Sequence, residues 1–223
     1  AAAIVAQNGL AGTVKVVAKR STGLVVGEDL QRPADVIVAE VFDQGLIREG
    51  ALPTLRHAVH HLAAPGAAVI PRAATVKGVL IELPALRRVN PIRDIEGFDL
   101  SAFDAFRSNY MNTPDLNREE HKRLSDVFTI ASYDFAALKP SGSAAAEEKP
   151  VSVKIAEAGT VHAVAYWFDL DLADGVIYST DPGAGVSHWG QAVQFFDSDT
   201  AVTAGATVPL TVLLGEMQIA FRI

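Results

Sequence analysis

The sequence predicts an α/β region followed by a region of antiparallel β structure. Up to residue 71, candidate strands alternate with helical segments, which favours a parallel sheet with crossover helices. Over residues 72–223, short segments rich in β-branched and aromatic residues are bounded by turns, which favours an antiparallel β-barrel or sandwich. Hydrophobic residues make up 49% of the chain, which suits a globular core.

The elements of residues 1–71 follow from local signals. Gly9 and Gly12 provide a stop after an initial segment that resembles the last turns of a helix. Pro53 is suited to the first turn of another helix, because its missing N–H is not needed there. The expected elements are a helix end at 1–8, strands at 13–18, 36–39 and 67–70, and a helix at 53–64. The strand at 36–39 is entirely apolar and is expected to be fully buried.

The elements of residues 72–223 are mostly strands. No flexible linker precedes them, so we expect the two regions to pack together. A polar and partly helical insertion occupies residues 97–126, and loops of that length are more often functional than accidental. The candidate strands are ATVKGVLIEL, VFTIASYDF, VSVKIAEAG, TVHAVAYWFDLDL, QAVQFFD, TVPLTVLL and MQIAFRI.

The composition excludes several functional classes. The chain has no cysteine, which excludes disulfides, thiolate metal sites and a cysteine nucleophile, and fits a reducing, cytoplasmic location. Its formal net charge of -7 disfavours direct binding to nucleic acid. No apolar run reaches the roughly 18 residues of a membrane span, and no basic segment at the start suggests a signal peptide, so no membrane partner is expected.

Two carboxylates flank a short loop after the strand at 36–39. Glu40 stands at the carboxyl end of the strand, where ligands bind in open parallel sheets, and Glu49 follows nine positions later. Two carboxylates facing one pocket can share a proton, bind a hard cation, or hold a planar cation. Alternatively, an acidic residue here only caps the following helix, an equally probable interpretation from composition alone.

The histidines indicate no metal site. His57 and His61 lie one turn apart in the predicted helix with His60, but the HExxH glutamate and a third ligand are missing, so a packed or solvated helix face is expected. We expect His162, within a strand, to be structural and His121 to be exposed.

Two further short motifs are weak by themselves. Ser187-His188-Trp189 follows a glycine-rich turn, and it offers a proton carrier beside an aromatic wall or simply a turn with a packed tryptophan. AKRSTGL, residues 18–24, is a candidate cofactor rim at a strand end. The chain has no GxGxxG or P-loop motif.

Taken in order, these motifs resemble the protein arginine methyltransferases. Glu40 and Glu49 correspond to that family's double-E loop, and Ser187-His188-Trp189 corresponds to its THW loop. The segments FDQGLIREGALP and KRST are similar to the corresponding sequences of the tandem-module, monomethylating subgroup. The segment GTVHAVAYWFDL resembles the family's barrel segment. The resemblance extends over essentially the whole chain.

The resemblance implies a partial Rossmann-like, S-adenosylmethionine-dependent methyltransferase domain (1–71) followed by an antiparallel β-barrel that binds substrate (72–223). Glu40 and Glu49 would hold the guanidinium of a protein arginine, His188 would organise the site or carry the proton, and Trp189 would wall the arginine tunnel. The resemblance also assigns Ser187 and Phe42 to substrate binding, and Arg20 and Ser21 to the cofactor's adenine rim.

The sequence departs from the family pattern in places that bear on function. Arg20-Ser21 replaces a usual Val-Glu, Ser187 replaces Thr, and Phe42 and Ala51 replace methionines of dimethylating relatives. The glycine-rich cofactor motif would lie before residue 1, so most of the cofactor site is expected upstream. Residues 101–126 correspond to the dimerisation arm, which implies homodimer or tandem-module pairing. A noncatalytic pseudoenzyme or interaction module is the alternative.

Overall fold

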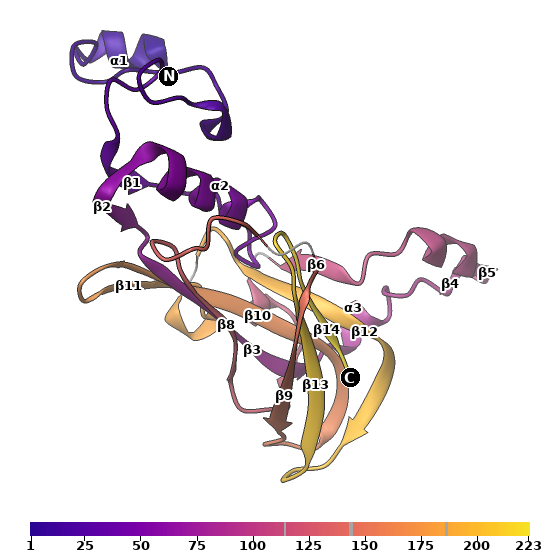
Figure 1. Cartoon of the computed structure of the whole chain (residues 1–223). Coiled ribbons are helices and arrows are strands. Elements are labelled where there is room, and N and C mark those ends of the chain that lie inside the picture. Colours follow the sequence, from indigo (N-terminus) through magenta and orange to yellow (C-terminus); the bar gives the residue numbers. More distant parts are fainter. Residues whose placement is uncertain (114, 143–144, 186) are drawn as a thin grey trace.

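The computed structural model describes residues 1–113, 115–142, 145–185 and 187–223. Figure 1 shows a small N-terminal region at one end, a larger β region at the other, and an arm that projects from the β region. Among the described residues, none of the helices has both the length and the apolar composition required to cross a membrane.

The N-terminal region contains one parallel strand pair joined by a helix. Strand β1 pairs in parallel with β2, with Val38 opposite Ile70. The connecting helix begins as α-helix and ends as π-helix, so the predicted helix ends at Leu62 and β2 starts earlier than expected. The elements are α1 (Ala2–Gln7), η1 (Ser21–Gly23), β1 (Ala34–Val38), α2 (Ala51–His57), η2 (Ala58–Leu62) and β2 (Ala63–Ile70).

Two expectations for this region were wrong. Residues 13–18 form no strand, because no described strand lies alongside them to complete a hydrogen-bonded ladder. The apolar strand β1 forms, but it is not fully buried, since Val38 is 74% exposed. The described β1 has a strand neighbour on one side only, which leaves its other edge open.

The β region consists of two main antiparallel sheets. The seven-stranded sheet runs β6-β12-β10-β3-β7, with β11 added to β10 and β8 added to β3, and the second sheet runs β14-β13-β9. The strands are β3 (Ala73–Glu82), β6 (Tyr110–Thr113), β7 (Lys122–Arg123), β8 (Phe128–Asp134), β9 (Glu147–Lys154), β10 (Gly159–Ala173), β11 (Val176–Ser179), β12 (Gln191–Val202), β13 (Thr207–Leu214) and β14 (Ile219–Arg222), with short helical turns η4 (Leu116–Arg118) and η5 (Pro182–Ala184) between them.

The antiparallel character was predicted correctly, but the described strands do not close into one hydrogen-bonded barrel. The sheets meet instead through isolated contacts. Gln194 of β12 donates its side-chain amide to the carbonyl of Phe221 in β14 and accepts from the same residue's N–H. A single bridge also pairs Ser125 with Ile155. The buried side-chain amide of Gln194 thus links two strands that do not pair through their backbones.

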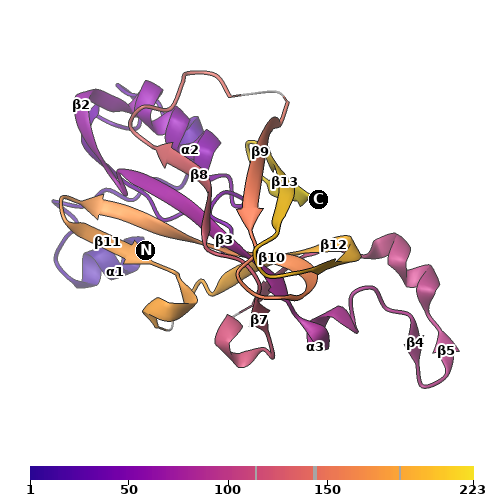
Figure 2. The ribbon, with the colours of Figure 1, turned by 90° about the horizontal axis from the view of Figure 1, so that it is seen from below.

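The projecting arm differs from the segment expected to form it. The arm contains α3 (Pro84–Arg87) at its base, then β4 (Asp94–Ile95), β5 (Phe98–Asp99) and η3 (Ser101–Phe106), and both views show β4 and β5 extending away from the sheets (Figures 1 and 2). The later part of residues 101–126 returns to the main sheet, where β6 pairs with β12 and β7 with β3. The expected boundary at residue 71 remains a prediction.

Gly78 of β3 allows close packing in the middle of the seven-stranded sheet. It lies opposite Tyr166 of β10 and Phe128 of β8. A Cβ atom at this position would lie 3.0 Å from the carbonyl oxygen of Ala165 and 2.8 Å from Cδ1 of Ile130.

We therefore predict that Gly78→Ala lowers the free energy of unfolding by about 1–3 kcal/mol, because the added methyl group overpacks the space between β3 and its neighbouring residues. Urea denaturation of the two proteins measures this difference. Gly12→Ala is the matched control, since a Cβ there meets nothing within 4 Å. Equal effects of the two substitutions would contradict the prediction.

Candidate functional site

The loop between β1 and α2 presents two exposed carboxylates on either side of a buried segment. Glu40 and Glu49 are exposed, whereas Phe42, Leu46 and Ile47 between them are at most 2% exposed. These three side chains belong to a hydrophobic core that they share with the β strands. Burial of the middle of the loop therefore fixes both carboxylate-bearing ends at the junction of the two regions.

Backbone turns give this loop its shape. The N–H of Leu46 donates to the carbonyl of Asp43, and Leu46 has a φ of 82°, which is unusual for a residue with a branched side chain. Gly50, with a φ of 85°, follows Glu49 and is the N-cap residue of α2. Gly45 lies against Tyr166, whose ring would be 3.1 Å from an added Cβ. Non-glycine residues in such backbone conformations cluster at functional sites.

Asp43 is a buried carboxylate that ties the loop to the β region. Its two oxygens accept hydrogen bonds from the N–H of Arg48, at 2.9 Å, and from the hydroxyl of Tyr110, at 2.8 Å. The Arg48 guanidinium lies over the Tyr110 ring, 3.5 Å from its centroid. Burial, together with the neighbouring Tyr166 and Asp43, raises the pKa of Tyr110, so its hydroxyl stays protonated and donates to the carboxylate.

Trp189 joins the Ser187-His188-Trp189 motif to the loop that bears Glu40 and Glu49. Its indole Nε1 donates to the carbonyl of Phe42 at 2.8 Å, so residues 147 positions apart in sequence meet at the candidate site. The indole packs edge to face against Phe168 and Tyr178, with ring centroids 5.6 and 5.4 Å apart. These contacts fix the orientation of the ring.

Ser187 and His188 have different roles around Trp189. Ser187 is buried, and its Oγ accepts from the Tyr178 hydroxyl at 3.1 Å and from the Trp189 N–H at 3.2 Å. The hydroxyl retained at this position therefore shapes the turn. His188 is exposed, with its ring centroid 3.9 Å from that of Trp189. Its imidazole is thus available to solvent or a ligand.

A cavity of about 320 Å³ lies beside Glu40. Ser21 and Glu40, two of the sequence-predicted residues, both line it. Arg20 immediately precedes η1 and is exposed. The remaining walls of the cavity are mainly apolar: Leu30, Ala34, Ile37, Val38, Ala39, Val41, Thr54, Leu55, Ala58 and Leu62.

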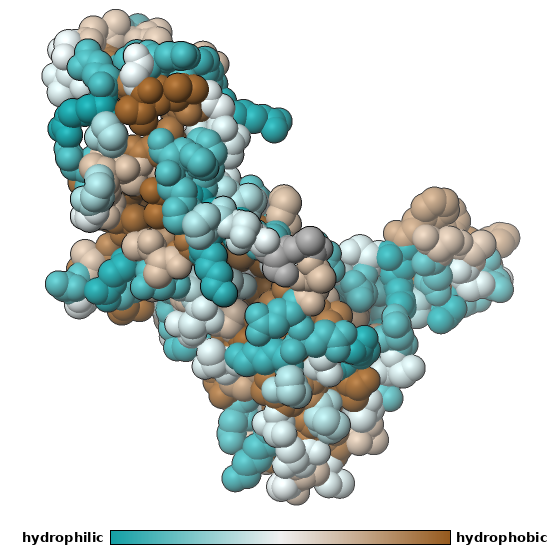
Figure 3. Space-filling view, in the orientation of Figure 1, coloured by the Kyte–Doolittle hydropathy of each residue, from teal (hydrophilic) through white to brown (hydrophobic). Residues whose placement is uncertain are grey.

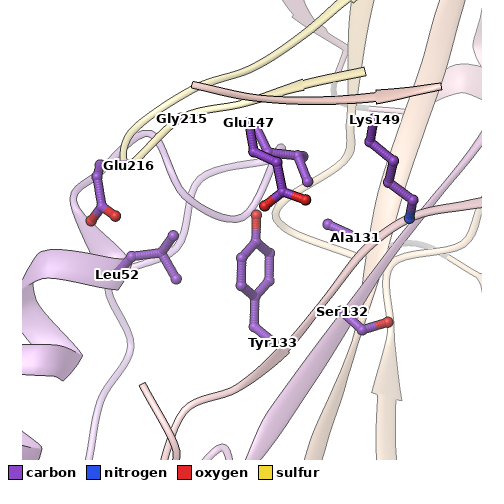
Figure 4. Close-up of a pocket in the computed structure, with 9 residues that line it drawn as sticks. Leu52, Ala131, Ser132, Tyr133, Glu147, Lys149, Gly215 and Glu216 are labelled. Carbon is purple, nitrogen blue, oxygen red and sulfur yellow. The ribbon is translucent and has the colours of Figure 1, made fainter. Parts of the chain in front are cut away.

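A larger cavity, of about 400 Å³, lies between α2, β8, β9 and the β13–β14 turn. Figure 4 shows the Tyr133 hydroxyl pointing toward the carboxylate of Glu147, with Glu216 across the cavity. Burial and these two carboxylates raise the pKa of Tyr133 to about 12. None of the residues predicted for the site lines this cavity.

The other histidines do not line the cavity beside Glu40. The buried Nδ1 of His162 accepts from the N–H of Leu83, as expected for a structural histidine, whereas His121 is half-buried rather than exposed. The rings of His57 and His61 contact each other, and burial lowers the pKa of His57. Within the described ranges, no group of three or more His, Asp or Glu side chains is placed to hold a metal ion.

Sequence reasoning missed the residues that support the site. Asp43 lies between the two glutamates without an obvious partner in sequence, and Tyr110 lies in an insertion that was interpreted as polar. Phe168 and Tyr178 are typical strand residues, so no sequence signal distinguishes them. The ring centroid of Phe42 lies 5.8 Å from that of Phe135, and the Phe42 carbonyl accepts the hydrogen bond from Trp189.

Comparisons with known proteins agree with the sequence resemblance. Residues 73–222 match the family described as the arginine methyltransferase oligomerization subdomain. The chain is 33% identical over 209 residues to an arginine N(omega)-methyltransferase of Streptomyces achromogenes subsp. streptozoticus, covering 93% of this chain and 56% of that protein. It is 32% identical over 235 residues to protein arginine N-methyltransferase 7 of Danio rerio, covering 95% of this chain and 34% of that protein.

A solved structure, the Trypanosoma brucei PRMT1 enzyme-prozyme heterotetrameric complex with AdoHcy, has a similar fold. The TM-score is 0.79 at 20% identity, and the match covers 99% of this chain and 70% of the solved one. The chain spans between about a third and just over half of the length of the two curated relatives named above. Because the family match extends over more than half of its residues, the chain belongs to the protein arginine methyltransferase family.

Proposed function

We propose that this chain carries the arginine-binding part of a protein arginine N-methyltransferase that uses S-adenosylmethionine. The observation that carries the proposal is the hydrogen bond from Trp189 Nε1 to the Phe42 carbonyl. It joins the loop bearing the two exposed glutamates to the loop bearing an exposed histidine, which supports the assignment of these three groups to one site.

The paired glutamates suit the chemistry of a guanidinium. Arginine remains protonated in proteins and presents a planar fork of N–H donors that carboxylates bind bidentately. For Glu40 and Glu49, the structure records no hydrogen bond or ion pair to another described residue, so each carboxylate is available to a substrate. Holding the fork orients the nitrogen that receives the methyl group, and positioning of this kind accounts for much of the rate of group transfer.

The cavity beside Glu40 fits part of the methyl donor. Its apolar side chains suit an adenine ring, the Ser21 hydroxyl can form a hydrogen bond with it, and the Glu40 carboxylate suits a nearby positive charge. S-adenosylmethionine, when bound, supplies an electrophilic methyl group. Arg20 is exposed and precedes Ser21 in the chain, and Ser21 supplies a hydroxyl in place of the carboxylate of many relatives.

The remaining residues act around the transferred group. Trp189 walls the arginine channel, Ser187 holds the turn, and exposed His188 organises the site or carries the proton released by the guanidinium. Phe42 contributes through its carbonyl, while its ring and Ala51 fill space from the core side. We propose that this filling restricts the acceptor and favours a single methylation.

The arm suits pairing with a second copy or a tandem module. Figure 3 shows hydrophobic side chains gathered at the outer end of the arm. Phe98, Phe103 and Phe106 are 70%, 60% and 87% exposed, and such apolar clusters mark protein interfaces. This observation also favours the alternative function, a noncatalytic interaction module that uses the arm and the β region.

The paired glutamates yield the first prediction for activity. We expect Glu40→Gln to reduce kcat for methylation of an arginine-glycine-rich peptide about 10²–10³-fold, because one charged partner of the guanidinium is lost. The assay uses the complete gene product, with S-adenosylmethionine labelled in its methyl group. Glu120→Gln is the control, since Glu120 is exposed and outside the site. Unchanged activity of Glu40→Gln would contradict the proposal, and an inactive parent protein would favour the interaction module.

The cavity yields a binding prediction. In the complete gene product, Ser21→Ala is expected to weaken S-adenosylmethionine binding about fivefold, the effect of losing one hydrogen bond. Calorimetry measures the dissociation constant directly, without requiring turnover. Thr22→Ala serves as the control, because Thr22 is exposed and does not line the cavity. If both variants bind equally, Ser21 does not contact the cofactor.

The arm yields a prediction for assembly. Phe106→Asp is expected to shift the protein toward the monomer, because a charge placed in an apolar interface is left without compensation. Light scattering after size-exclusion chromatography measures the mass. Ile177→Asp, which alters an apolar side chain of β11 that is 60% exposed, is the matched control. A monomeric parent protein, or an equal effect of the control, would argue against pairing through the arm.

A further inference from the structure

The arm returns to the β region at Tyr110, the residue that also contacts the glutamate-bearing loop. Tyr110 is the first residue of β6 and pairs with Gln194 of β12. Its backbone therefore belongs to the edge of the main sheet, whereas its hydroxyl reaches Asp43. One residue thus contacts the end of the arm, the sheet and the candidate site.

Hydrogen bonds hold the base of the arm. The side-chain amide of Asn90, where the arm leaves, donates to the carbonyl of Ser108, where it returns, at 2.9 Å. Ser108 Oγ donates to the Tyr110 carbonyl at 2.8 Å, and the N–H of Phe195 donates to the Asn109 carbonyl at 2.7 Å. The position of Tyr110 is consequently linked to that of Asn90, where the arm leaves the β region.

The contacts on the loop side reach the residue before Glu49. Tyr110 donates to one Asp43 oxygen, and the other oxygen accepts from the N–H of Arg48. The guanidinium of Arg48 covers the Tyr110 ring. Asp43 is 7% exposed, so the loss of one donor would leave a buried carboxylate incompletely satisfied. The resulting energetic cost would favour a rearrangement of the loop.

We infer that Tyr110 is a positioning residue that links the arm to the placement of Glu49. The inference rests on the proposed function and names a means of regulating the same site. Docking of the arm on a partner restricts Ser108–Tyr110, the Tyr110 hydroxyl transmits this restriction to Asp43, and Asp43 holds the backbone of Arg48. Tyr110 itself does not touch the substrate.

Hydrogen exchange tests the local link without requiring activity. Tyr110→Phe retains the ring and the β6 pairing but removes the hydroxyl. It is expected to increase exchange of the Leu46–Gly50 amides about tenfold, since a buried hydrogen bond to a charged group is lost. Tyr133→Phe is the control, because the buried Tyr133 hydroxyl has no hydrogen-bond partner among the described residues. Equal exchange in the two variants would overturn the inference.

The link to the arm has its own test. Asn90→Ala removes the hydrogen bond at the base of the arm and is expected to increase exchange of the same amides in the parent protein. In the Tyr110→Phe background it is expected to add little, because the link is already broken, as in a double-mutant cycle of coupled residues. Independent, additive effects would overturn the proposed route from the arm to the loop.

Kinetics separate positioning from general stability. In the complete gene product, Tyr110→Phe is expected to lower kcat about tenfold while KM for S-adenosylmethionine and the thermal midpoint stay close to those of Tyr133→Phe. If methylation is present but the two variants have the same kcat, the inference fails and the proposed function stands. If exchange changes as expected but the parent protein does not methylate, the proposed function fails and the positioning role of Tyr110 stands.

Discussion

Burial of the loop between Glu40 and Glu49 is the constraint on which the candidate site depends. Phe42, Leu46 and Ile47 lie in a core that also contains β-strand side chains such as Phe168 and Val212. Removal of these apolar groups from water favours packing of the two regions against each other. Because the exposed carboxylates lie directly beside the buried residues, the core that joins the regions also places the charges.

Polar contacts then select one arrangement of this loop. A hydrophobic core by itself tolerates small shifts, whereas the buried Asp43 carboxylate requires donors in specific places. Two residues of the β region donate hydrogen bonds to this loop: Trp189 to the Phe42 carbonyl and Tyr110 to the Asp43 carboxylate. The β region therefore supplies two supports for the loop that bears the carboxylates.

The sequence predicted part of the fold from periodicity and composition. The antiparallel β region, the helix that starts near Pro53 and the packing of the two regions were recoverable, because each depends on local signals or on overall apolar content. The strand expected at 13–18 and the burial of β1 were wrong, since both depend on neighbouring strands that a local pattern cannot reveal. Closure of the strands into a barrel also depends on contacts that a local pattern cannot reveal. The described sheets are linked through Gln194 and Phe221 instead.

The sequence by itself determined the family, through Glu40, Glu49 and the Ser187-His188-Trp189 motif, because these residue types at these spacings are readable without coordinates. Only the tertiary structure decided which groups hold them. Asp43 meets Tyr110, and Trp189 meets Phe42, across separations of 67 and 147 residues. Contacts between residues so far apart in sequence arise when a shared core brings strands together. The periodicity of the sequence does not predict them.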